Sequence, residues 1–393
     1  MTPIIRPSIF ALSTLFFLTA CGEKNTPQHQ QAASAASAAS TAASAASTPV
    51  AAVASEARGP ISEQDNALLK QAQGIFQPLP DAAEMQTAHP FTNEQVKLGH
   101  QLWYEQRLSR GNTVSCNSCH NLASTGVDNM PTSQGFKGQF GTRNSPTALN
   151  AALLGSQFWD GRAATVEEQA GGPLLNPVEM ANKDEAAVVK KIAHIPEYQE
   201  AFKKAYPDNG GAITFANITD AIAAFERTLL TPTKWDEYLK GNVNALSVQE
   251  RNGVRAFIGN GCIACHTGTN LGGQSFQKFG LAKGPYWQFT GSTQHDEGRF
   301  GVTKVESDKF IFRVPGLRNV ARTYPYFHDG SVWELDKAVS IMGETQLGKQ
   351  LPKEEVDSIV AFLKALSGKV PESARTLPEL PVSAEANSRP DNQ

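Results

Sequence analysis

The stretch Cys116-Asn117-Ser118-Cys119-His120 decides the architecture, and its pattern returns as Cys262-Ile263-Ala264-Cys265-His266. Both stretches have the form C-x-x-C-H, which is the attachment signature of c-type haem. In this signature the two thiols add to the haem vinyl groups, and the histidine binds the iron as its proximal ligand. Two copies in one chain therefore predict two covalently bound haem c groups.

The composition is that of an ordinary globular protein. The chain has 393 residues, of which 40% are hydrophobic and 19% are charged, and this length allows more than one domain. A net charge of −3 argues against a nucleic-acid partner. Four of the five cysteines belong to the two motifs, which leaves none for a structural disulfide, and the fifth is Cys21.

Residues 1–20 have the pattern of an export signal. The apolar run 9–18 is too short for a membrane-spanning helix. Residues 18–21, Leu-Thr-Ala-Cys, resemble a bacterial lipobox, in which the cysteine is lipidated and becomes the mature N-terminus; an ordinary signal peptide is the alternative. Covalent haem is attached outside the cytoplasm, and Gly22 is not the aspartate that retains lipoproteins in the inner membrane. We therefore expect a periplasmic protein anchored to the outer membrane through Cys21.

The rest of the chain divides by composition into a tether, two domains and a tail. Residues 21–61 are rich in alanine and serine, with too few large apolar residues to bury a core, which predicts a disordered tether. We expect a first haem domain over 62–231 and a second over 232–370. The proline-rich tail 371–393 is expected to be extended.

An internal repeat indicates that the two domains arose by duplication. Thr92 and Ser247 each begin a capping-box pattern that predicts a helix ahead of a haem motif. We predict further helices over 218–230 and from Pro352, and loops over 121–142 and 271–301. The fold class is thus mainly α, with two cytochrome-c-like domains and long loops. The repeat is also visible in two pairs of residues four apart, Gly99 with Trp103 and Gly253 with Phe257.

The sixth ligand of each iron decides its chemistry, since His120 and His266 each supply only the fifth. Methionine raises the reduction potential and suits electron transfer, whereas an open position permits peroxide chemistry. Met342 is the only methionine after the second motif, so we predict that it ligates the second iron. The alternative is a methionine packed in the core.

In the first repeat Glu179 and Met180 occupy the corresponding region. A carboxylate facing an open iron could take a proton from one peroxide oxygen and return it to the other. A solvated Glu179 and a ligating Met180 are the alternatives, and spacing alone does not choose between them.

The chain resembles the bacterial di-haem cytochrome c peroxidases over about residues 65 to 380. In that family the N-terminal haem is peroxidatic and has a low potential, and the C-terminal His/Met haem has a high potential and receives electrons. The motifs that carry the resemblance are Cys116–His120, Gly126–Asp128, Pro131–Ser133, Arg143–Thr147, Gln157–Ala163, Pro177–Met180, Cys262–His266, Pro325–His328 and Met342.

The resemblance implies a function and several site residues. Hydrogen peroxide would be reduced to water with electrons from a small cytochrome c or a copper protein, and the enzyme would be a homodimer. Glu179 would be the distal acid–base residue, Gln169 would line the same pocket, and Trp159 would lie between the haems. A calcium ion would be held by the Asn144 side chain and by the backbone carbonyls of Thr323 and Pro325.

One position departs from the family pattern. Many members carry a histidine that caps the resting first iron, and Phe136 stands at that position here. We expect an open first site that needs no reductive activation, unless another side chain such as His295 or Met130 reaches the iron. His328 is interpreted as a propionate or loop contact.

Two other functions remain possible from the sequence. A di-haem electron carrier without peroxidase activity is favoured if Met180 ligates the first iron. The related enzyme that matures a tryptophan-derived quinone in a partner protein is disfavoured, because it has a tyrosine where Met342 stands.

Overall fold

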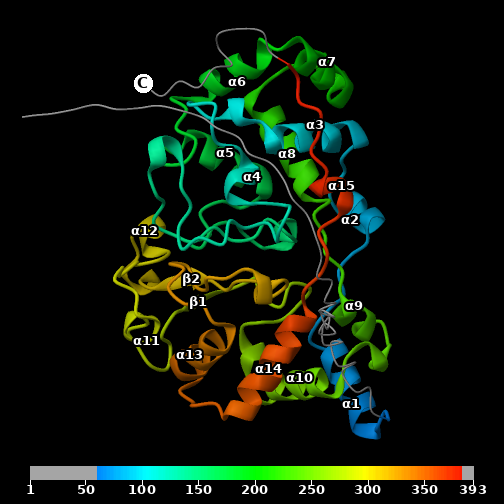
Figure 1. Cartoon of the computed structure of the whole chain (residues 1–393), viewed down its shortest axis with the longest axis vertical. Helices are drawn as coiled ribbons and strands as arrows, with labels where there is room; N and C mark the ends of the chain where they lie inside the picture. The colour runs from blue at the N-terminus through cyan, green and yellow to red at the C-terminus, as the bar shows by residue number, and fades with distance from the viewer. Residues whose placement is uncertain (1–59, 383–393) are drawn as a thin grey trace, which may run out of the picture. The chain divides into compact units, whose positions relative to one another are not determined.

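The computed structural model describes residues 60–382, which fold mainly into helices (Figure 1). The predicted signal peptide, Cys21 and nearly all of the tether 21–61 lie outside the described residues. Within this range no helix is both long and apolar enough to cross a bilayer. The helices are α1 (Glu63–Gln73), α2 (Ala82–Ala88), α3 (Asn93–Tyr104), α4 (Cys116–Cys119), α5 (Val166–Leu175), α6 (Glu185–Ala193), α7 (Pro196–Ala205), α8 (Phe215–Glu226), α9 (Lys234–Leu239), α10 (Val248–Gly259), α11 (Trp287–Thr290), α12 (Phe300–Thr303), α13 (Leu335–Leu347), α14 (Lys353–Ala365) and α15 (Glu372–Arg375).

Helices α3 and α8 pack together at the centre of the first repeat. The Thr92 hydroxyl accepts the backbone N–H of Gln95, and the Gln95 side chain accepts the N–H of Thr92, as the capping-box pattern predicts. Gly99 allows the two helices to approach closely, because a Cβ there would lie 1.8 Å from the carbonyl oxygen of Ala221. Apolar residues of both helices form one buried cluster, which includes Leu98, Leu102, Trp103, Ile218, Ile222 and Phe225.

Helices α10 and α14 repeat this arrangement in the second repeat, where they pack against each other (Figure 1). Ser247 caps α10 through the backbone N–H of Glu250. A Cβ on Gly253 would lie 2.0 Å from the carbonyl oxygen of Ser358 in α14. Since the glycine–helix contact recurs at the corresponding position, the predicted two-domain helical architecture is confirmed.

The N-terminal end of the folded chain packs in the hydrophobic cluster of the second repeat, and the C-terminal end packs in that of the first repeat. Phe76, just after α1, packs edge to face on Trp235 with ring centroids 5.4 Å apart, so α1 belongs to the cluster of α10 and α14. Val370 and the α15 residue Ala374 are buried in the cluster of α3 and α8. The tail from 371 was expected to be extended; instead it begins with a short helix whose apolar side is covered.

The glycine-rich stretch 271–301, which we expected to be a loop, contains regular structure. Strand β1 (Phe276–Lys278) pairs antiparallel with β2 (Ile311–Arg313), with Phe276 opposite Arg313. The stretch also contains α11 and the start of α12. A third buried cluster forms here, and its members are Phe279, Tyr286, Phe312, Tyr326, Val332, Ala338 and Ile341.

Candidate functional site

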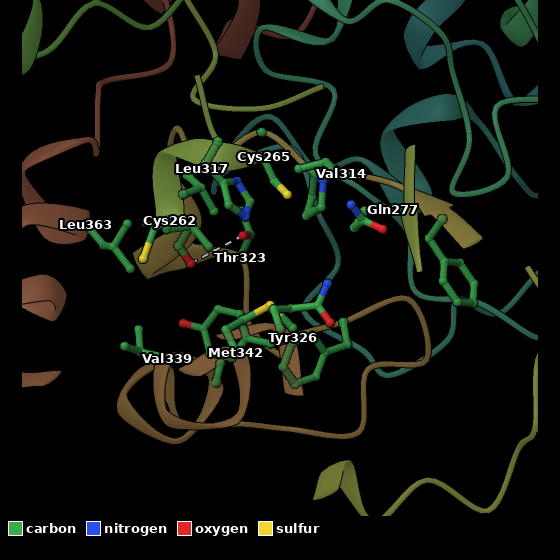
Figure 2. Close-up of a pocket in the computed structure, with 18 of the residues that line it drawn as sticks. Cys262, Cys265, Gln277, Val314, Leu317, Thr323, Tyr326, Val339, Met342 and Leu363 are labelled. Atoms are coloured by element: carbon green, nitrogen blue, oxygen red, sulfur yellow. Dashed lines mark hydrogen bonds between the residues drawn. The ribbon is translucent and has the colours of Figure 1, made fainter. Parts of the chain in front are cut away.

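A cavity of about 390 Å³ lies beside the second C-x-x-C-H motif. Cys262, Cys265 and His266 line it on one side, and Met342 of α13 lines it on the other. Figure 2 shows the Met342 sulfur across the cavity from Cys262 and Cys265. The two thiols, the imidazole and the opposing thioether are the groups that a His/Met-ligated haem c requires.

The imidazole of His266 is oriented by its own loop. Its Nδ1 lies 3.0 Å from the carbonyl oxygen of Leu271, so an N–H at Nδ1 donates to this carbonyl and Nε2 is left for a metal. Gly272 makes this loop possible: its φ is +128°, and a Cβ there would lie 2.2 Å from the Pro315 carbonyl oxygen. Phe257 flanks the imidazole at 6.2 Å between ring centroids. The second site therefore fits haem c.

The first motif has matching surroundings. Cys116 and Cys119 begin and end α4, and the His120 ring lies 6.1 Å from that of Trp103. Trp103 therefore lies beside His120 as Phe257 lies beside His266, which agrees with the internal repeat. The Nδ1 of His120 is buried and has no hydrogen-bond partner within residues 60–382. The donor set of the first site fits haem c as well.

Glu179 lies in the loop after α5 with a half-buried side chain. The Asn176 amide donates to a Glu179 carboxylate oxygen at 2.7 Å. Burial raises the pKa of Glu179 above its ordinary value, while the charge of Arg162 and the Asn176 hydrogen bond oppose this shift. Burial is the main cause that raises the pKa of the Cys119 thiol, and the charges of Asp128 and Glu179 add to this shift, so the Glu179 carboxylate is within electrostatic range of the first motif. Such a carboxylate can exchange a proton near neutral pH more readily than a solvated one.

Phe136 and Met180 occupy packed positions beside Glu179. The Phe136 backbone N–H donates to the Glu179 carbonyl oxygen at 2.8 Å, and its ring, 6% exposed, lies under the Arg110 guanidinium at 5.4 Å. The Met180 side chain is 3% exposed and belongs to the hydrophobic cluster of the first repeat. Packing in that cluster is the ordinary role of a core methionine.

Trp159 lines the second cavity, whereas Gln169 lies in α5 and is not among the residues that line this cavity. The Trp159 indole N–H donates to the Asn144 carbonyl oxygen at 2.8 Å, and the residue lines the cavity. Gln169 is half-buried in α5, before the loop that carries Glu179. Among the hydrogen bonds of the described residues, none joins its side chain to Glu179.

The three residues predicted to bind calcium all line the second cavity. The Asn144 side-chain NH₂ donates to the Met130 carbonyl oxygen at 2.9 Å, which leaves the Asn144 amide oxygen available as a ligand. Thr323 and Pro325, whose backbone carbonyls are the other predicted ligands, lie in one loop. An amide oxygen and carbonyl oxygens suit calcium.

The other histidines discussed above have contacts with aromatic side chains. His328 is buried, stacks on Phe312 at 4.0 Å between ring centroids and lies 3.2 Å from the Tyr286 hydroxyl. Burial lowers the pKa of His328 to about 4, so it is neutral at pH 7. His295 is exposed and stacks on Trp287, and Met130 is also exposed.

Sequence reasoning missed several contacts that hold the site together. Asn176 was not recognised as the partner of Glu179, although its position three residues before it was a usable signal. The Leu271 carbonyl, which orients His266, carries no side-chain signal. Arg313 was not recognised as a residue of the second cavity.

Comparisons with known proteins agree with this geometry. Residues 93–244 match the family model of di-haem cytochrome c peroxidase, and residues 250–367 match that of cytochrome c. The cytochrome c551 peroxidase of Pseudomonas aeruginosa is 48% identical over 332 residues, which cover 84% of this chain and 94% of that protein. The cytochrome c551 peroxidase of Nitrosomonas europaea is 47% identical over 296 residues, which cover 75% of this chain and 85% of that protein.

More distant relatives have the same architecture. The methylamine utilization protein MauG of Methylorubrum extorquens is 32% identical over 341 residues, covering 84% of this chain and 92% of that protein. A crystal structure of a MauG-like protein associated with microbial copper homeostasis aligns with a TM-score of 0.67 at 27% identity, over 77% of this chain and 96% of that chain. With two C-x-x-C-H sites in a duplicated helical fold and these relatives, the chain belongs to the di-haem cytochrome c peroxidase family.

Proposed function

We propose that this protein is a cytochrome c peroxidase that reduces hydrogen peroxide to water. Electrons would enter at the site of His266 and be used at the site of His120. The observation that carries this proposal is the inequality of the two sites: a thioether from Met342 faces the second motif, whereas the Glu179 carboxylate lies near the first. Membership of the family supports the same activity.

Glu179 would transfer a proton between the two peroxide oxygens. When bound, haem supplies the iron that binds peroxide and passes electrons. The Glu179 carboxylate would accept a proton from the near peroxide oxygen and give it to the far oxygen, which leaves as water. Two electrons and two further protons balance the formation of two waters. The Asn176 amide occupies one carboxylate oxygen and so holds the group in a defined orientation.

Trp159 would belong to the electron route, and Gln169 would line the peroxide pocket. The support for Trp159 is its position: its ring borders the second cavity, and its own loop belongs to the first repeat. Gln169 has support from the family resemblance alone.

The first site would be open at rest, without reductive activation. Phe136 cannot ligate iron, and its backbone is hydrogen-bonded to the loop of Glu179. Absorption and electron paramagnetic resonance of the oxidised protein test this proposal. A high-spin signal from the first haem is expected, and a bis-histidine low-spin signal would contradict it.

The remaining proposals concern assembly and location. A calcium ion would bind at Asn144, Thr323 and Pro325, the protein would be a homodimer, and the donor would be a small cytochrome c or cupredoxin. Lipid at Cys21 would anchor it to the outer membrane on the periplasmic side. The domain limits 62–231 and 232–370 remain part of this proposal.

The test of the main proposal is rapid mixing of the reduced holoprotein with hydrogen peroxide and then with a reduced c-type cytochrome. Stoichiometric donor oxidation, two electrons per peroxide, is expected. If both haems stay low-spin and no peroxide is consumed, the chain is an electron carrier instead. The packing of Met180 in the hydrophobic cluster favours the peroxidase over this alternative.

A further inference from the structure

Arg313, the last residue of β2, connects the second cavity to the loop of Trp159. The residue is 2% exposed and lines the cavity. Its backbone N–H donates to the Trp159 carbonyl oxygen at 2.8 Å, and its side-chain Nε–H donates to the Phe158 carbonyl oxygen at 3.0 Å. These two bonds fix the guanidinium between the cavity and the first repeat.

Among the described residues, no carboxylate forms an ion pair with the Arg313 guanidinium. Its Nη1 is buried and makes no hydrogen bond to any residue from 60 to 382. Burial lowers the pKa of Arg313 to about 10, so the group is still a cation at neutral pH. A buried charge without a counter-charge is strongly unfavourable in a protein interior. An anion from outside the chain would remove this cost.

Nearby carboxylates are already engaged by other arginines. Asp160 is the carboxylate that acts electrostatically on Arg313, but it accepts from Arg143 at 2.6 Å and from Arg162 at 3.0 Å. Arg143 also pairs with Asp296 at 2.6 Å. Three guanidinium groups thus share two carboxylates, which leaves a positive excess around Arg313.

We propose that Arg313 binds a propionate carboxylate of the haem c held by Cys262, Cys265 and His266, and that it raises the reduction potential of this haem. Gln277 of β1 also lines the cavity, near Val314 in Figure 2, and adds a polar amide to its lining. A propionate has the charge and the planar pair of oxygens that a guanidinium recognises.

The effect on potential follows from charge. The oxidised haem carries one more positive charge than the reduced haem, so a fixed cation nearby disfavours oxidation. Pairing of the propionate with Arg313 also neutralises an anion that would otherwise stabilise the oxidised state. A raised potential suits the site at which electrons enter. The inference rests on the second haem of the proposed function, but not on turnover of peroxide.

The test is a spectroelectrochemical titration of holoprotein carrying Arg313→Gln, Arg313→Lys or Arg322→Gln. Arg322→Gln is the matched control, because it removes the same charge from an exposed side chain of the same repeat. In Arg313→Gln the equilibrium constant for reducing the second haem should fall about tenfold, which is about 59 mV for one electron. Arg313→Lys should keep most of the wild-type potential. If the second haem has the same reduction potential in Arg313→Gln as in the control Arg322→Gln, the proposal is wrong.

A second measurement covers the case in which Arg313→Gln does not fold, or in which the substitution changes more than the charge. Resonance Raman spectra of wild type and Arg313→Lys report the propionate bending mode of the haem. We expect this mode to shift when a guanidinium is replaced by an ammonium, and an unchanged mode would overturn the assignment. Both readouts remain valid in a protein without peroxidase activity, so they separate this inference from the proposed reaction.

Discussion

Asn150 and Asn319 donate their side-chain amides to the same atom, the hydroxyl oxygen of Thr231, at 2.8 and 2.9 Å. Both asparagines have a left-handed backbone, and each stands four residues after a proline, Pro146 or Pro315. They therefore occupy equivalent positions of the two repeats. The repeats meet at Thr231, which is the residue where the sequence predicts the first domain to end.

Replacement of Thr231 by alanine should destabilise the protein. Thr231 is fully buried, so its loss leaves two buried amide groups without an acceptor. An unsatisfied buried group costs about 1–3 kcal/mol, and we expect a loss of that size in the free energy of unfolding. Urea unfolding of the holoprotein measures it. Thr231→Ser keeps the hydroxyl and is the control; equal midpoints for the two variants would contradict the prediction.

Gly253→Ala should destabilise the second repeat. Its Cβ would lie 2.0 Å from the Ser358 carbonyl oxygen, so α10 and α14 would have to separate. Overpacking of this kind costs about 1–3 kcal/mol. Gly259→Ala, in the same helix but with open space around its Cβ, should leave stability unchanged or raise it slightly. Thermal unfolding of the two variants distinguishes a packing effect from a general effect of alanine.

Glu179→Gln should lower peroxide turnover by about 10²- to 10⁴-fold, because the amide cannot accept the peroxide proton. Exposed Glu197 of α7 offers a control, since Glu197→Gln removes a carboxylate outside the loop of Glu179. Steady-state assays with a reduced c-type cytochrome measure the effect. Equal rates for Glu179→Gln and wild type would remove Glu179 from the mechanism.

The same carboxylate predicts a pH dependence of the wild-type rate. Only the ionised form of Glu179 can accept a proton, and burial raises its pKa. Activity should therefore be full above this raised pKa and should fall as the pH drops through it, at a higher pH than an ordinary glutamate would give. A pH profile of the second-order rate with peroxide measures this limb. The limb should vanish in Glu179→Gln, and its persistence there would assign it to another group.

Local sequence signals predicted both haem motifs and four of the longer helices, namely α3, α8, α10 and α14. Thr92 and Ser247 have their capping partners within three residues, so the starts of α3 and α10 could be predicted from neighbouring letters. The spacing of Trp103 to Gly99, and of Phe257 to Gly253, also correctly indicated an internal repeat, since both aromatic rings flank the histidine of a haem motif.

Contacts between distant segments could not be predicted in this way. The packing of Phe76 on Trp235, and the burial of Ala374 in the first repeat, join segments separated by more than 150 residues and carry no periodic signal. Strand β1 was missed because three residues within a glycine-rich stretch give no alternating pattern. The Arg313 side chain donates to the backbone carbonyl of Phe158. Every residue has such a carbonyl, so the identity of the residue gives no sign of this contact.

Met342→Leu should change the second haem without disturbing the fold. Leucine has nearly the volume of methionine but no sulfur, and such exchanges usually cost less than about 1.5 kcal/mol. Loss of a thioether ligand should lower the equilibrium constant for reduction by on the order of a hundredfold, because methionine ligation raises the potential of c-type haem. The absorption band of methionine-ligated ferric haem should disappear as well. Met85→Leu, at a buried methionine of α2, is the matched control and should leave both properties unchanged. Since Met342 enters from α13 across the cavity from His266, a band that survives in Met342→Leu would mean that another side chain completes the second iron, and the inequality of the two sites would then need a different explanation.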